Sequence, residues 1–306
     1  MIYLFMNYTA RKSTSFKSIL KYFFFILIIG GAIFYIGYSF VLQRKVAALT
    51  PGQKKIAVIG HAGSGFFSPL NPFNPLPPNS MASLLKAMTD GADGLEIDVQ
   101  LSQDGVPILF HDEKLEGMTE ASGLVGHLPA TQLLSLAYTG GFFYELFHDE
   151  KVISLEDLLK KFVAYPQKPD LHLDLRNYSK LPPADYAQKL MPMLRKYGYP
   201  VQKLWFVTDD EKLLHAFRTI EPQAYFLLDM DRSYEESLKI VLDHKLHGMV
   251  ANGQSITKAQ MKEMRQHQLQ VVFFGGKARS SIYNMLLLQP DAIEVNNVAA
   301  MHEMVQ

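Results

Sequence analysis

From residue 55 onward, the chain alternates between short apolar runs and longer stretches whose apolar residues recur every three or four positions. The run "KIAVIGH" at residues 55–61, for example, precedes "SMASLLKAMTDG" at residues 80–91. The first pattern is typical of a buried strand and the second of an amphipathic helix. Similar pairs follow, among them "DLHLDLR" with "PADYAQKLMPMLRKYG", "AYFLLD" with "YEESLKIVLDHK", and "DAIEV" with a last short helical stretch.

This alternation sets the expected fold class. About eight strand-to-helix units in roughly 250 residues is the rhythm of a (β/α)₈ TIM barrel, an α/β fold. A doubly wound open sheet has the same alternation and is the alternative. No glycine fingerprint for a dinucleotide and no Walker lysine follows a predicted strand, which favours the barrel.

One strand carries two acidic residues at an unusual spacing. The segment "DGLEIDVQLSQDGVPILFHDEKL", residues 93–115, contains two apolar runs joined by an Asp-Gly turn. Side chains alternate between the faces of a strand, so Glu96 and Asp98 are expected to project together, with the intervening apolar residues on the other face. Two like charges this close repel each other unless a cation, a shared proton or a basic partner lies between them.

The N-terminal part of the chain differs from the rest. Residues 22–41, "YFFFILIIGGAIFYIGYSFV", contain no charged residue, and a helix needs about 20 such residues to cross a bilayer. The apolar stretch of a cleaved signal peptide is usually shorter, and a small-residue cleavage site follows it. Here the stretch continues into "LQRK" at residues 42–45, which favours an uncleaved anchor in the lipid bilayer over a cleaved signal.

The flanking charges predict an orientation for this anchor. Four basic residues precede the stretch and two follow it directly: Arg11, Lys12, Lys17 and Lys21 before it, and Arg44 and Lys45 after it. The positive-inside rule then places the N-terminus in the cytoplasm and the C-terminal domain outside it, as in a single-pass protein of a bacterial inner membrane. Counting Lys54 and Lys55 makes the two sides equal. The expected division is a basic segment 1–21, an anchor 22–41, a linker 42–54 and a barrel domain 55–306.

Composition excludes several classes of function. The chain has 30 basic and 30 acidic residues, and no basic stripe with interleaved aromatic residues occurs, so we expect no nucleic-acid partner. It has no cysteine, which excludes disulfides, thiolate metal sites and a thiol nucleophile.

In a TIM barrel, functional side chains gather where the strands end. Six polar residues lie at or near the ends of predicted strands: His61, Glu96, Asp98, His111, Asp174 and Arg176. Three carboxylates meeting at one rim would suit a hard cation such as Mg²⁺ or Ca²⁺. Taken singly, each feature has a plainer interpretation, such as a solvated strand face, a structural histidine or an Asp174–Arg176 ion pair.

The motifs together resemble the glycerophosphodiester phosphodiesterases, within the phospholipase-C-like barrel superfamily. That family has His-Arg-Gly at the end of its first strand, a Pro-Glu-Asn turn, Glu-x-Asp on the second strand, and a later His-Asp. The resemblance spans about residues 55–298, and residues 95–112 are its most specific part. The matching segments are "HAG" (61–63), "PPNS" (77–80), "LEIDVQLSQDGVPILFHD" (95–112), "MTEASG" (118–123) and "ISLEDLL" (153–159).

The resemblance implies a role for each matching residue. His61 and His111 match the two catalytic histidines, and Glu96 and Asp98 match two metal ligands. Asp174 stands where the family usually has a third ligand, a glutamate, although aspartate fills that place in the related sphingomyelinase D enzymes of spider venoms. The remaining matches concern the substrate: Arg176 stands where a lysine contacts the phosphate, and Asn79 is the retained asparagine of the turn.

Two positions depart from the family pattern. Ala62 replaces an arginine that helps to neutralise the phosphate, and Pro78 replaces the glutamate of the turn. The stretch "FFGGK" stands where the family often has Trp-Thr-x-Asn, so Phe274 could supply an aromatic wall to the substrate site and Lys277 a positive charge. Phe274 could equally be a core residue.

The expected function follows from the resemblance. The chain would be a phosphodiesterase dependent on Mg²⁺ or Ca²⁺. It would hydrolyse glycerophosphodiesters or lysophospholipids to glycerol 3-phosphate or a lysophosphatidate-like product, plus an alcohol. One histidine would act as base and the other as acid, in an order that the sequence leaves open. The alternatives are a transferase that forms a cyclic phosphate, like sphingomyelinase D, and a membrane-tethered barrel that binds such ligands without turnover.

Overall fold

The computed structural model of the chain describes residues 16–49, 55–66, 76–139 and 149–306. Eight parallel strands form a closed ring, because β1 pairs with β2 on one side and with β10 on the other. In order around the ring they are β1 (Ala57–Gly60), β2 (Gly94–Leu101), β5 (Asp170–Leu175), β6 (Leu204–Thr208), β7 (Tyr225–Asp229), β8 (Gly248–Asn252), β9 (Gln270–Gly275) and β10 (Ala292–Val295). The expected (β/α)₈ barrel is confirmed.

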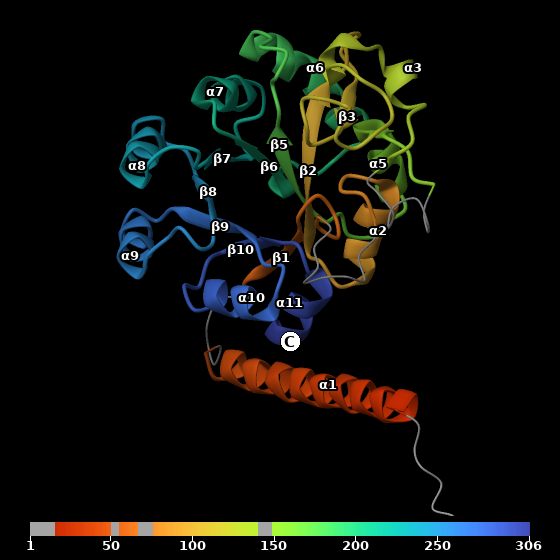
Figure 1. Cartoon of the computed structure of the whole chain (residues 1–306). Coiled ribbons are helices and arrows are strands. Elements are labelled where there is room, and N and C mark those ends of the chain that lie inside the picture. The colour runs from red at the N-terminus through yellow and green to blue at the C-terminus, as the bar shows by residue number, and fades with distance from the viewer. Residues whose placement is uncertain (1–15, 50–54, 67–75, 140–148) are drawn as a thin grey trace, which may run out of the picture.

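Helices surround this ring (Figure 1). They are α2 (Met81–Thr89), α5 (Leu155–Phe162), α6 (Pro183–Lys196), α7 (Glu211–Ile220), α8 (Tyr234–Asp243), α9 (Lys258–Gln266), α10 (Arg279–Leu286) and α11 (Val298–Val305). Several begin at a capping box, in which Ser154, Ser233 or Thr257 accepts a hydrogen bond from the third helical residue. Such caps satisfy backbone N–H groups that the first turn leaves without partners, and so fix where each helix starts.

A smaller antiparallel unit extends the ring between β2 and β5. Strand β3 (Pro107–Leu109) pairs with β2, and β4 (Ile153–Ser154) pairs with β3. The 3₁₀ turn Val125–His127 and the short helix α3 (Ala130–Leu133) lie between these two strands, and a second 3₁₀ turn, Val201–Lys203, precedes β6. The unit has its own small hydrophobic core, separate from that of the barrel.

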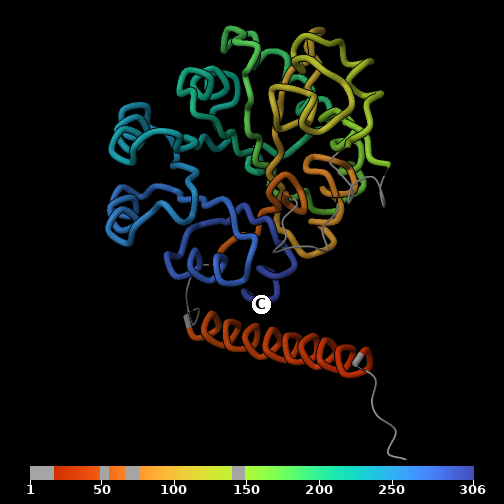
Figure 2. Tube along the Cα trace, viewed as in Figure 1, coloured from red at the N-terminus to blue at the C-terminus, as the bar shows by residue number. Residues whose placement is uncertain are grey.

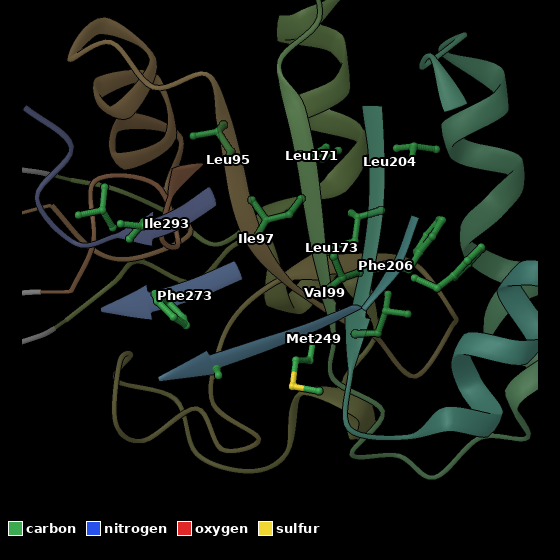
Figure 3. Packing of buried hydrophobic residues seen from close by; sticks show 14 of the residues in the cluster. Leu95, Ile97, Val99, Leu171, Leu173, Leu204, Phe206, Met249, Phe273 and Ile293 are labelled. Carbon is green, nitrogen blue, oxygen red and sulfur yellow. The ribbon is translucent and has the colours of Figure 1, made fainter. Parts of the chain in front are cut away.

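The main core lies between the strands and the helices. Leu95, Ile97 and Val99 follow one another along β2 in this layer (Figure 3). The inside of the ring holds a second apolar cluster formed by Ile59, Val207, Leu227, Val250, Val272 and Ala292. Because side chains alternate along a strand, β2 directs its apolar residues outward and places Glu96 and Asp98 on the inner face.

Helix α1 (Phe16–Leu49) lies outside the barrel against α10 and α11 (Figures 1 and 2). It continues past the apolar stretch 22–41, and its last turns bury Leu42 and Val46 against the domain. The Gln43 side chain also donates a hydrogen bond to the Glu303 carbonyl, at 3.1 Å. The helical segment Lys17–Ala48 is long and apolar enough to cross a membrane. A signal sequence can have the same length and composition.

Candidate active site

Three carboxylates meet inside the barrel on two neighbouring strands. Glu96 and Asp98 project from β2, and Asp174 projects from β5 at the position paired with Asp98. One carboxylate oxygen from each residue lies within 4.8 Å of the others. The parallel register of the two strands therefore brings Asp174 beside the two acids of β2.

The segments after β1 hold two of these carboxylates in place. The Ala62 backbone N–H donates to Glu96 Oε2 at 2.6 Å, and the Asn79 side-chain amide donates to Asp98 Oδ2 at 2.8 Å. Asn79 in turn accepts from the Asp98 backbone N–H at 3.1 Å. Ala62 and Asn79 both have positive φ, at 47° and 61°, and the Asn79 N–H donates to the Ala62 carbonyl. This left-handed backbone, which costs about 1 kcal/mol per residue, aims the donors at the carboxylates.

Arg176 is the basic partner of the cluster. Its Nε lies 3.1 Å from Asp98 Oδ1, and its Nη2 lies 2.5 Å from Asp174 Oδ2. Burial alone would lower the pKa of Arg176, but the carboxylates of Asp174 and Asp98 raise it above its ordinary value. The guanidinium therefore offsets part of the repulsion between these two acids and stays charged.

One guanidinium does not neutralise the whole cluster. Burial, followed by the charge of Asp98, raises the pKa of Glu96 well above its ordinary range. Burial also raises the pKa of Asp174, although Arg176 opposes the shift. Three convergent carboxylate oxygens are the donor set that Mg²⁺ or Ca²⁺ prefers. A bound cation would also offset the cost of ionising these buried groups. The residues therefore fit a hard divalent cation.

The two histidines stand at the same end of the barrel. His61 follows β1 and His111 follows β3, and the Phe66 ring lies edge-on to both, with centroid distances of 5.1 and 5.2 Å. Burial lowers the pKa of His61, whose Nε2 lies 3.9 Å from Glu96 Oε2. His111 Nδ1 lies 2.7 Å from Asp112 Oδ1, which fixes the orientation of its ring. The two imidazoles therefore have different surroundings.

Several side chains of the candidate site border cavities. One of about 730 Å³ is bordered by Asp174 and Arg176, and another of about 250 Å³ is bordered by His111 and Asp112. A third, of about 410 Å³, is bordered by Phe274 and Lys277.

The structure thus brings together most of the residues that the sequence singled out. Asn79 is fully buried, with its amide engaged by Asp98. The Phe274 ring packs against the apolar cluster inside the barrel. Its centroid lies 6.0 Å from that of the His61 ring. Lys277 is exposed and borders a different cavity from Arg176.

A buried pair near the cluster was not predicted from the sequence. His172 Nδ1 lies 2.7 Å from Glu294 Oε1, and both side chains are buried inside the barrel. The His172 ring stacks on Trp205, which stacks on Tyr225. Two signals could have found the pair: an acid inside the apolar run "DAIEV", and a histidine two residues before Asp174, hence on the same face.

Known proteins match the chain over most of the barrel. The model of the glycerophosphoryl diester phosphodiesterase family matches residues 70–300. A glycerophosphodiester phosphodiesterase of Bacillus altitudinis is 26% identical over 219 residues, which are 71% of this chain and 88% of that protein. Glycerophosphodiester phosphodiesterase 1 of Rattus norvegicus is 26% identical over 124 residues, 40% of this chain, and the match spans only 35% of the rat protein.

Solved structures share the fold. A phosphodiesterase of Oleispira antarctica, determined in complex with the product sn-glycerol-3-phosphate, superimposes with a TM-score of 0.72 at 20% identity. The superposition covers 85% of this chain and 98% of that one. Because the family model covers well over half of the sequence, the chain belongs to the glycerophosphoryl diester phosphodiesterase family.

Proposed function

We propose that the chain is a metal-dependent phosphodiesterase that hydrolyses glycerophosphodiesters. The observation that carries this proposal is the convergence, at one end of the barrel, of three buried carboxylates, two histidines and an arginine. Metal-assisted cleavage of a phosphate diester needs a set of oxygen ligands, a base, an acid and a positive charge for the phosphate. The candidate site has a residue for each of these roles.

Glu96, Asp98 and Asp174 would hold the cation. Their oxygens converge, and two of them are oriented by Ala62 and Asn79. When bound, Mg²⁺ or Ca²⁺ would stabilise negative charge on the nonbridging phosphate oxygens. Arg176, which borders the large cavity beside the acids, would contribute further positive charge to the phosphate.

The different surroundings of the two imidazoles suggest how they divide the proton transfers. Burial lowers the pKa of His61, which favours the neutral imidazole, so His61 would take the proton from the attacking water. His111, held by Asp112 beside the smaller cavity, would give a proton to the departing alkoxide. The products would be a phosphomonoester and an alcohol. For the Oleispira antarctica phosphodiesterase the named product is sn-glycerol-3-phosphate, and we propose the same product here.

Substrate and location are further parts of the proposal. Lysophospholipids are a second substrate class, because α1 would keep the barrel beside a lipid surface. We propose the division into a basic segment 1–21, an anchor 22–41, a linker 42–54 and a barrel domain 55–306. The contacts that α1 makes with α10 and α11 through Leu42 and Val46 would hold that domain close to the bilayer.

Removing divalent metal is expected to abolish phosphodiesterase activity. Mg²⁺ or Ca²⁺ should restore it better than Zn²⁺, because all three proposed ligands are carboxylates and the chain has no cysteine. The measurement is release of sn-glycerol 3-phosphate from glycerophosphocholine, before and after chelation and after each metal is added back. Full activity in excess chelator would contradict the metal assignment.

The metal should also stabilise the protein more at high pH than at low pH. Glu96 and Asp174 have raised pKa values in the metal-free folded state. Between the ordinary carboxyl pKa and these raised values the folded state binds more protons than the unfolded state, so metal-free stability falls as pH rises. A metal needs ionised ligands, so the gain in melting temperature should be larger at about pH 8 than at about pH 5.

Thermal unfolding with and without Mg²⁺ or Ca²⁺ at the two pH values tests this expectation. The double variant Glu96→Gln/Asp174→Asn is the control, because it keeps the side-chain shapes but removes both titrating ligands. A metal-induced gain that is equal at both pH values in the wild type would refute the linkage.

Each histidine is expected to be needed for turnover. His61→Ala and His111→Ala should lower kcat by roughly 10²–10⁴-fold, the range for a lost acid or base, and added metal should not rescue them. Asp174→Asn should act by weakening metal binding, so excess metal should partly restore its rate. His215→Ala, an exposed histidine on α7, is the matched control and should retain full activity.

This experiment also separates an enzyme from a binding protein. Wild-type protein that binds glycerophosphodiesters but never cleaves them at saturating metal would show that the barrel is a binding module. Ala62 and Pro78 would then be the first positions to revert to the family residues.

The barrel domain is expected to lie outside the cytoplasm. Protease added to intact spheroplasts should digest it, because the basic residues that flank residues 22–41 predict a cytoplasmic N-terminus. Complete protection of the domain in intact spheroplasts, with digestion only after lysis, would reverse the orientation.

A further inference from the structure

The small cavity beside His111 has an apolar lining. Phe66, Pro78, Phe110, Met118 and Tyr138 border it, together with His111 and Asp112. The two polar residues hydrogen bond to each other, at 2.7 Å between Nδ1 and Oδ1. Proline has no backbone N–H, and the Tyr138 hydroxyl donates to the Leu109 carbonyl at 3.4 Å. Among the described residues, the lining therefore presents mostly carbon to whatever enters.

This wall is anchored in a packed core. Phe110 and Tyr138 belong to the separate hydrophobic cluster of the antiparallel unit, and Met118 packs against it. The Phe110 and Tyr138 rings are stacked, with centroids 5.9 Å apart and planes 13° apart. Both rings are almost fully buried, at 1% and 5% exposure. Packing of this kind fixes the rings, so the cavity has a defined shape before any ligand arrives.

The large cavity on the Arg176 side has the opposite character. Its lining includes Asp209, Asp229 and Asp231, in addition to Asp174. Burial already raises the pKa of Asp229 to about 6. An apolar group placed there would remove more water from these carboxylates, which is costly, whereas the hydroxyl groups of a polar arm such as glycerol would find hydrogen-bond partners.

The candidate site thus has two lobes of different polarity, the apolar cavity beside His111 and the acidic cavity beside Arg176. A phosphate diester has two ester arms, and the arm whose ester oxygen His111 protonates would enter the apolar lobe when the phosphate lies by Arg176 and the carboxylates. We propose that the arm next to His111 is apolar, so that the preferred substrates are amphiphilic phosphodiesters with one hydrocarbon arm and one polar arm. This inference rests on the proposed function.

The position of His111 sets the direction of cleavage. It borders the apolar lobe, so it can protonate the ester oxygen of the apolar arm as the bond from phosphorus to that oxygen breaks. The attacking water loses its proton to His61 and forms the new bond to phosphorus. The apolar arm therefore leaves as an alcohol, and the polar arm stays on the phosphomonoester.

A homologous series of substrates tests the proposal. The methyl, propyl, butyl and hexyl esters of sn-glycerol 3-phosphate differ only in their hydrocarbon arm and remain soluble as monomers. With the full-length protein in lipid nanodiscs and saturating Mg²⁺ or Ca²⁺, kcat/KM for release of sn-glycerol 3-phosphate should rise with chain length. The increase should approach about fourfold per methylene, as expected for a buried methylene group, and level off once the cavity is filled.

Variants locate the effect in this cavity. Met118→Gln places an amide in the apolar wall at nearly constant volume and should lower the ratio of butyl to methyl kcat/KM at least fivefold. Met118→Leu keeps the wall apolar and should preserve the ratio. Met193→Gln is the control, because Met193 is a half-buried methionine on α6 that borders none of the cavities described above. It should leave both rates unchanged.

The outcomes distinguish this inference from the proposed function. Equal kcat/KM for the methyl and butyl esters in the wild type would overturn the inference and leave the phosphodiesterase function intact. An unchanged chain-length preference in a folded Met118→Gln variant would likewise show that another surface binds the arm. If neither these esters nor glycerophosphocholine were cleaved with metal present, the proposed function would be wrong, and the inference with it.

Discussion

The mutual repulsion of three buried carboxylates is the constraint on which the site depends. Glu96, Asp98 and Asp174 lie close together inside the barrel, where the dielectric is low and like charges are costly. The surrounding chain compensates with specific donors: Arg176 bridges two of the acids, the Ala62 N–H binds Glu96, and Asn79 binds Asp98. The left-handed backbone at Ala62 and Asn79 is part of the same compensation, because it aims these donors. Barrel closure makes the arrangement possible, since β1 joins the strand that carries Glu96 and brings the segment after it over the acids.

Much of this arrangement could be predicted from local sequence patterns. Alternation of apolar and amphipathic stretches indicated the barrel, and the period of two along a strand put Glu96 and Asp98 on one face. The bridge from Arg176 to Asp98 depends on the register between β2 and β5, which no local pattern encodes. His172 and Glu294 are 122 positions apart in the chain, so their contact exists only once the ring has closed. The position of Phe66 between the histidines is likewise a result of packing.

The two departures from the family pattern have different structural meanings. Ala62 contributes its backbone N–H, and its side chain is completely buried, so the position serves the carboxylates and offers no side-chain charge to a phosphate. Pro78 borders the apolar cavity beside His111, where a charged residue would interrupt the hydrocarbon wall. On the proposed function, the loss of charge at position 62 would affect phosphate neutralisation, and the loss at position 78 would affect which ester arm the site accepts.

The charge balance that results bears on how the proposed reaction must begin. In the metal-free site, Arg176 is already engaged by Asp98 and Asp174, and Glu294 and Asp229 add to the negative potential around them. A phosphate diester is an anion, so this site would repel it more strongly than a family site that keeps an arginine at position 62. A divalent cation on the carboxylates would offset the negative charge that Arg176 leaves unbalanced, and would give the phosphate oxygens a positive partner. On the proposed function, metal binding would therefore precede substrate binding, and without the arginine the chain would depend on its metal for recognition of the phosphate as well as for catalysis.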